Sequence, residues 1–128
     1  MTVQHTHRLD GHSLVPTALF DRLVARITAD HGFDPTLSAR IVDQAPVFLK
    51  ACADNRGTPL SPSWLVDIGW HAFLLHTREY AEFCQRVAGR FIHHVPTDEP
   101  GGTTTGHTIE AIRASGFTVD ETLWENSC

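Results

Sequence analysis

Two residues with ionisable side chains, Asp67 and His71, lie four positions apart in an otherwise apolar stretch of this 128-residue chain. In an α-helix, residues four apart are separated by about 40° around the axis, so their side chains are neighbours. A neighbouring carboxylate and imidazole can share a metal ion, or the carboxylate can orient the imidazole for proton transfer. The spacing therefore predicts a functional site on this helix.

Histidine is frequent, with nine in the chain, and two of these residues, His93 and His94, are adjacent. In an extended segment adjacent side chains point to opposite sides, so one of the pair is expected to face the helix that carries His71. Imidazole, carboxylate and thiolate bind zinc, and imidazole also suits iron and copper. We predict a divalent transition metal (zinc, iron or copper) as cofactor, with ligands from His71, His93, His94, Asp67 and Cys84.

Three interpretations of these residues stay open. In the first, a metal ion with an open coordination position activates water or polarises a small-molecule or peptide substrate, and His71, Asp67 and His94 are the catalytic residues. In the second, the protein is a metal-free interaction module that binds a protein partner through an acidic C-terminal face. In the third, it is a metal-free acid–base enzyme whose histidine is oriented by Asp67.

The acidic C-terminal face follows from the distribution of charge. Residues 1–96 carry nine basic and nine acidic side chains, so the formal net charge of −5 arises entirely from residues 97–128. Phosphate binding requires a basic surface, so nucleic acid is not expected as a partner. A basic protein partner is one interpretation of this face, and a solvated surface that keeps the protein soluble is the other.

The composition is typical of a globular protein in a reducing compartment. No apolar run approaches the roughly 18 residues of a membrane span, so no membrane association is expected. Three cysteines without a C-x-x-C pair argue against a disulfide framework, which predicts a cytoplasmic location. Nine arginines against one lysine suggest a bacterial source.

The apolar spacing predicts an all-α fold: a flexible N-terminus at residues 1–13, then one compact bundle of about five helices over 14–128. A short extended segment is expected near 90–96. The helix at 62–76 is apolar nearly all round, so it is expected to be central and buried. Gly69 within it predicts a close approach by another segment, and we take the His93–His94 segment as that neighbour. The predicted helices cover residues 16–31, 35–52, 62–76, 78–88 and 104–115, with a last short turn at 120–124.

A set of spaced residues runs through the same region: Asp67, Gly69, Trp70, His71, Leu74, Leu75, Tyr80, Cys84, Gly89 and His94. This pattern resembles the core of the glycine-rich domain-containing protein-like family, whose small bacterial members lack the long glycine-rich tail of the plant members. The resemblance implies no defined activity, and it carries over Asp67, His71, Cys84 and His94 as matched positions. Many relatives have a second histidine two places after the first. Phe73 occupies that place here, which removes one candidate metal ligand.

Overall fold

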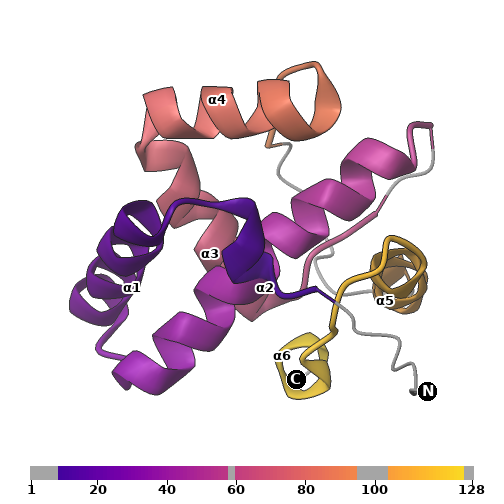
Figure 1. Ribbon diagram of the computed structural model, residues 1–128. Coiled ribbons are helices and arrows are strands. Elements are labelled where there is room, and N and C mark those ends of the chain that lie inside the picture. The colour runs from indigo at the N-terminus through magenta and orange to yellow at the C-terminus, as the bar shows by residue number, and fades with distance from the viewer. Residues whose placement is uncertain (1–8, 58–59, 95–103, 126–128) are drawn as a thin grey trace, which may run out of the picture.

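A computed structural model of the chain describes residues 9–57, 60–94 and 104–125. These residues fold into a compact all-α bundle, as predicted (Figure 1). A short 3-10 helix, η1, precedes six α-helices, and the described residues form no strand beyond one isolated bridge between Leu9 and Phe117. The elements are η1 (Gly11–Leu14), α1 (Thr17–His31), α2 (Pro35–Asp54), α3 (Trp64–Leu75), α4 (Thr77–Ala88), α5 (Thr104–Ala114) and α6 (Glu121–Trp124).

Local sequence signals set several helix ends where they were expected, although α3 begins at Trp64 after the Ser63 cap and not at residue 62. Asp34 precedes α2 and its carboxylate accepts a hydrogen bond from the Thr36 amide at 2.7 Å, which satisfies one free N–H of the first turn. Gly32 and Gly89 end α1 and α4 with a φ of 70°, the left-handed conformation that glycine adopts without strain. The short final helix, α6, also lies where it was predicted.

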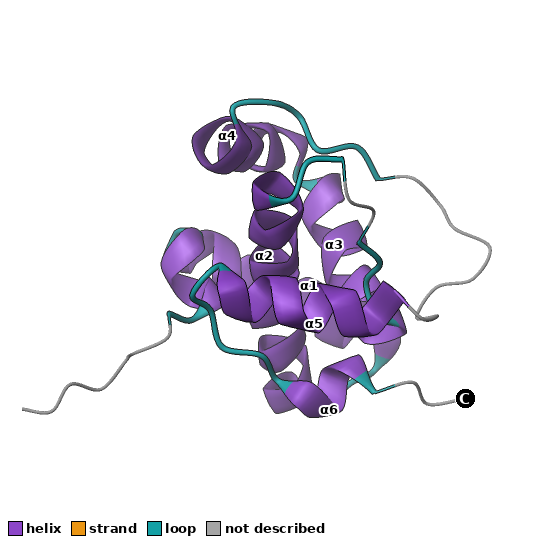
Figure 2. Ribbon diagram, turned by 90° about the vertical axis from the view of Figure 1, so that its right-hand side faces the viewer, coloured by secondary structure: helices purple, strands orange, loops and turns teal. Residues whose placement is uncertain are grey.

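The centre of the bundle is α2, which contacts η1, α1, α3, α4 and α5 (Figures 1 and 2). Its burial on several faces explains this position, because a helix without a broad polar face is stable only inside a protein. None of the helices in the described part of the chain is long and apolar enough to cross a membrane. The fully buried side chains of α2 are Ser38, Ile41, Val42, Gln44, Val47, Phe48, Leu49 and Ala51.

The prediction that α3 is buried all round is wrong. One face of α3 is open to solvent: Trp64 is 62% exposed, Leu75 is 55% exposed, and His71 between them is also exposed. Hydrophobicity does not identify the buried side of such a helix, because its exposed positions are also largely apolar. The exposed face of α3 carries the residues that could do chemistry.

Gly69 allows α3 to lie close to α2. A Cβ atom at Gly69 would lie 2.9 Å from Cγ2 of Ile41 and 3.0 Å from Cβ of Ala45, closer than side-chain atoms normally approach. The close approach inferred from this glycine therefore exists, but its partner is α2 and not the His93–His94 segment. This contact sets the short distance between α3 and α2, and the opposite face of α3 faces solvent.

Part of the predicted flexible N-terminus is described and is hydrogen-bonded to the bundle. The amide of Leu9 donates to the carbonyl of Gly116 at 2.9 Å, and the amide of Thr118 donates back to the carbonyl of Leu9 at 3.0 Å. These two bonds attach the start of the described chain to the loop between α5 and α6. The rest of the predicted flexible segment, residues 1–8, lies outside the described residues.

An ion pair joins the start of α6 to α2. Arg40 donates from Nε to one oxygen of Asp120 at 2.7 Å and from Nη2 to the other at 2.9 Å. This guanidinium lowers the pKa of the Asp120 carboxyl below its ordinary value of about 3.9. A lowered carboxyl pKa adds stability that is present above the unfolded-state value and is lost as the pH falls through the folded-state value.

We therefore expect Asp120→Asn to lower the free energy of unfolding at neutral pH by about 0.5–1 kcal/mol, since the pair is partly exposed. The difference between wild type and variant should shrink as the pH falls below the ordinary pKa of an aspartate and vanish once the Asp120 carboxyl is protonated in the folded protein. Urea unfolding across this range measures it, with the exposed Asp21→Asn as control. A difference that stays constant with pH would rule out the ion pair as its cause.

Candidate functional site

The closest polar contact at the exposed face of α3 joins Asp67 to His94. Nε2 of His94 lies 2.8 Å from Oδ1 of Asp67, and the side chains are 15% and 34% exposed, respectively. An ionised carboxylate only accepts hydrogen bonds, so Nε2 is the donor and carries the ring proton. In the neutral imidazole this leaves Nδ1 with a free lone pair. The pair thus defines both the orientation and the tautomer of His94.

Two further rings fix the place of His94. The ring of Trp70 meets that of His94 edge-on, with 4.4 Å between their centroids, and the His71 ring lies almost perpendicular to it at 5.2 Å. His94 therefore packs between a mostly buried tryptophan and an exposed histidine. Packing against the Trp70 edge limits rotation of the imidazole, while the His71 side leads to solvent.

A buried hydrogen-bond network holds the backbone just before His94. The hydroxyl of Tyr80 donates to the carbonyl of Ile92 and accepts a hydrogen bond from Nε1 of Trp70 at 2.9 Å. The amide of Ile92 donates to Sγ of Cys84 at 3.4 Å. Burial raises the pKa of the Tyr80 phenol well above its usual range, so the hydroxyl stays protonated and can donate. These contacts attach the segment to α4 and set the position of His94.

Burial alternates along the segment that carries His94. Phe91 and His93 are exposed, Ile92 is buried, and the ring of His93 contacts that of Phe91 at 4.9 Å. This is the alternation of an extended chain, and it turns His93 and His94 to opposite sides. The final residues of the predicted extended segment, 95 and 96, lie outside the described residues.

The structure thus brings together three of the five predicted metal ligands: Asp67, His71 and His94. It does not bring in His93, which lies on the outer side of the segment, or Cys84, whose sulfur accepts the Ile92 amide. Among the described residues, no three His, Cys, Asp or Glu side chains are grouped closely enough to hold a metal ion. As arranged, the group is a carboxylate–imidazole pair with a second imidazole beside it.

Trp70 is the residue of this site that sequence reasoning missed. Its place on an apolar helix predicts burial, and it does lie at 6% exposure, but its indole also contacts the His94 ring and donates to Tyr80. A buried tryptophan needs an acceptor for its N–H, which was the available signal. The acceptor itself, ten residues further on, follows from tertiary structure.

The chain matches one family model over most of its length. A family model described as UCP032817-like matches residues 13–113, which include α1 to α4, most of α5 and all residues of the candidate site. The resemblance to the glycine-rich domain-containing protein-like family is therefore a wrong assignment, and the shared positions it rested on cover a much shorter stretch. No curated protein and no solved structure matches the chain.

Proposed function

The chain belongs to the UCP032817-like family, and we propose that it is a small acid–base enzyme in which His94, held by Asp67, transfers protons. The observation that carries the proposal is the 2.8 Å contact between His94 Nε2 and Asp67 Oδ1. It fixes the tautomer of a mostly buried imidazole whose ring contacts the exposed His71. An imidazole with a fixed tautomer and a free lone pair is suited to act as a general base.

Each of the three residues has a distinct role in this proposal. Nδ1 of His94 takes a proton from water as the water oxygen bonds to the electrophilic carbon of a substrate. Asp67 stabilises the positive charge that forms on the ring, as an oriented carboxylate does for a catalytic histidine. As the bond between that carbon and the leaving group breaks, His71, exposed beside His94, gives a proton to the leaving group. His94 then releases its proton to solvent, and His71 takes one up from solvent. The reaction class is hydrolysis, with a small molecule or a peptide as substrate.

A divalent transition metal is the second candidate. Its support is the spacing of the two histidine rings, and the side chains would have to shift to hold an ion, since the described residues as arranged are not grouped closely enough for one. Two imidazoles bound to one tetrahedral ion have ring centres about 5 Å apart, and the His71 and His94 centroids are 5.2 Å apart. An ion would replace the proton shared by Asp67 and His94, with His71 as third ligand. Two imidazoles and one carboxylate leave positions for water, which suits hydrolysis too.

Zinc binding separates the two candidates. The affinity of each protein for zinc is measured in competition with a chelating dye. If His94 works without metal, the His71→Ala and His93→Ala proteins should have the same zinc affinity as wild type. If a metal site forms, His71→Ala should weaken zinc binding at least about 10-fold, in line with the loss of a ligand, while His93→Ala should not. The second result would replace the acid–base proposal with a metal-dependent one.

Hydrolysis of an activated ester tests the catalytic role itself. With p-nitrophenyl acetate as substrate and EDTA present, we expect a rate of hydrolysis that depends on His94 and Asp67 and is independent of His93. A cytoplasmic location, inferred from the cysteines, stays a prediction that fractionation of the source cells would test.

A further inference from the structure

Three exposed residues form a stripe along α3. Within the described part of the chain four large apolar side chains are exposed, and two of them, Trp64 at 62% and Leu75 at 55%, belong to this helix. They are eleven positions apart, which is about three helical turns, so they project from the same side within about 20° of each other. His71 is exposed on that side between them. We call Trp64, His71 and Leu75 the α3 stripe.

The stripe is the side of α3 that faces away from the bundle. The helix contacts α1, α2, α4 and α6, and Gly69 on its inner side lies against α2. Ile68 and Ala72, next to the stripe, are buried at 9% and 7% exposure. A tryptophan and a leucine left in water on one face are stabilised when another apolar surface covers them. The stripe therefore favours contact with a further protein surface.

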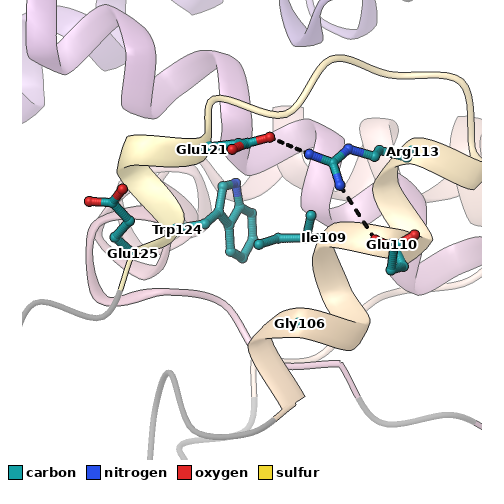
Figure 3. A pocket seen from close by; sticks show the side chains of 7 residues that line it. All are labelled: Gly106, Ile109, Glu110, Arg113, Glu121, Trp124 and Glu125. Atoms are coloured by element: carbon teal, nitrogen blue, oxygen red, sulfur yellow. Dashed lines mark hydrogen bonds and ion pairs between the residues drawn. The ribbon is translucent and has the colours of Figure 1, made fainter.

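The open cavity between α5 and α6 hides its largest apolar side chain. The cavity has a volume of about 510 Å³, but Trp124 in its wall is only 2% exposed. Its rim carries Arg113, which already bonds to Glu110 and Glu121 (Figure 3). The α3 stripe thus presents more apolar surface to a partner than this cavity does.

The order of residues along α3 is self-complementary. In a two-fold symmetric pair of antiparallel helices, residues whose positions add up to the same number lie opposite each other along the axis. Positions 64 and 75 add up to 139, and positions 67 and 71 add up to 138. An antiparallel pairing therefore places Trp64 against Leu75 of the partner subunit at both ends. It places Asp67 near His71 of the partner subunit in the middle.

The charges beside the stripe match in this direction. The side chain of Asp67 is 34% exposed, and its Oδ1 is bonded to His94. A carboxylate accepts several hydrogen bonds, so the exposed imidazole of the partner's His71 can donate to it. Parallel helices would instead place Asp67 against Asp67 of the partner subunit, and carboxylates repel each other. Charge complementarity therefore selects the antiparallel arrangement.

From the exposed stripe, its self-complementary order and this charge match, we propose that the protein forms a symmetric dimer through antiparallel packing of α3. Closed two-fold pairing of this kind is the commonest way in which identical chains associate. The symmetry turns the Asp67 side of both helices to one side of the dimer, so both His94 sites lie at the same edge of the interface. The partner's His71 then joins each Asp67–His94 pair. The dimer does not depend on the catalysis proposed for His94.

Sedimentation equilibrium of the full-length protein at up to about 200 µM measures the dimer. Trp64→Glu and Leu75→Lys should each raise its dissociation constant at least about 10-fold, because each places a charge against an apolar side chain of the partner. Glutamate suits the first residue of α3 and lysine the last, owing to the helix dipole. The fold should therefore be kept, as circular dichroism would show.

Mixing the two variants tests the direction of the helices. In a mixed antiparallel dimer the new glutamate faces the new lysine at one end, and Trp64 meets Leu75 of the partner subunit at the other. The mixture should therefore associate at least about 10-fold more tightly than either variant alone. Leu9→Glu, at a position 54% exposed outside α3, should leave the dimer unchanged. A monomeric wild type, a dimer that one of the two α3 variants fails to weaken, or a mixture as weak as its components would each overturn the proposal.

Discussion

Replacing Gln44 with leucine is expected to lower the free energy of unfolding by about 2–4 kcal/mol. Gln44 is fully buried on α2, and its amide joins three otherwise unsatisfied groups. Oε1 accepts from the Asp120 amide at 3.0 Å and from Trp124 Nε1 at 2.8 Å, while Nε2 donates to the Thr118 carbonyl at 2.9 Å. Leucine has a similar size but cannot hydrogen-bond to any of the three groups, and the N–H of Trp124 in particular is left buried without its acceptor, which is costly.

The same change at an exposed helical position provides the control. Gln85→Leu on α4 removes an amide that faces solvent, so the free energy of unfolding, measured in urea, should change by no more than about 0.5 kcal/mol. Circular dichroism follows both transitions. If Gln44→Leu proved as mild as Gln85→Leu, the network around Gln44 would not be what attaches α6 to the bundle.

The second large effect is expected at the proposed catalytic residue. His94→Gln should lower the rate of p-nitrophenyl acetate hydrolysis about 100-fold, a usual contribution of general acid–base catalysis. Glutamine can still donate a hydrogen bond to Asp67, so the local structure should be kept, but it has no basic nitrogen to accept a proton. Asp67→Asn should have a smaller effect of about 10-fold, because it removes the orienting charge and leaves the base in place.

The helices themselves follow from local signals in the sequence. Asp34 before Pro35 begins α2, and glycines 32 and 89 end α1 and α4, because these residues satisfy or relieve the free groups at helix ends. Such interactions act within a few residues of one another. They can be inferred without knowing how the helices pack.

Packing was harder to predict because it depends on contacts between distant residues. The composition of α3 predicted burial on all sides, yet Trp64 and Leu75 face solvent, and α2 occupies the centre instead. Gln44 gave a partial signal, as a polar residue among apolar ones in the pattern of α2. Its partners, more than seventy residues away, could not be inferred from that pattern.

The candidate site shows the same division. Helical spacing correctly placed Asp67 and His71 on one helix, but the closest partner of Asp67 is His94, 27 residues further along. Alternation in an extended segment predicted that one of the adjacent histidines would face α3, without deciding which. The decision comes from Tyr80 and Cys84, which hold the backbone of Ile92 so that His94 turns inward.

We propose His94, oriented by Asp67, as the proton-transferring group of this protein. Comparing ester hydrolysis by His94→Gln and His93→Gln proteins, both with EDTA present, tests it most directly, since the two residues are adjacent and only one faces Asp67. We expect a loss of about 100-fold for His94→Gln and wild-type activity for His93→Gln. Equal rates for the two variants and wild type would contradict it.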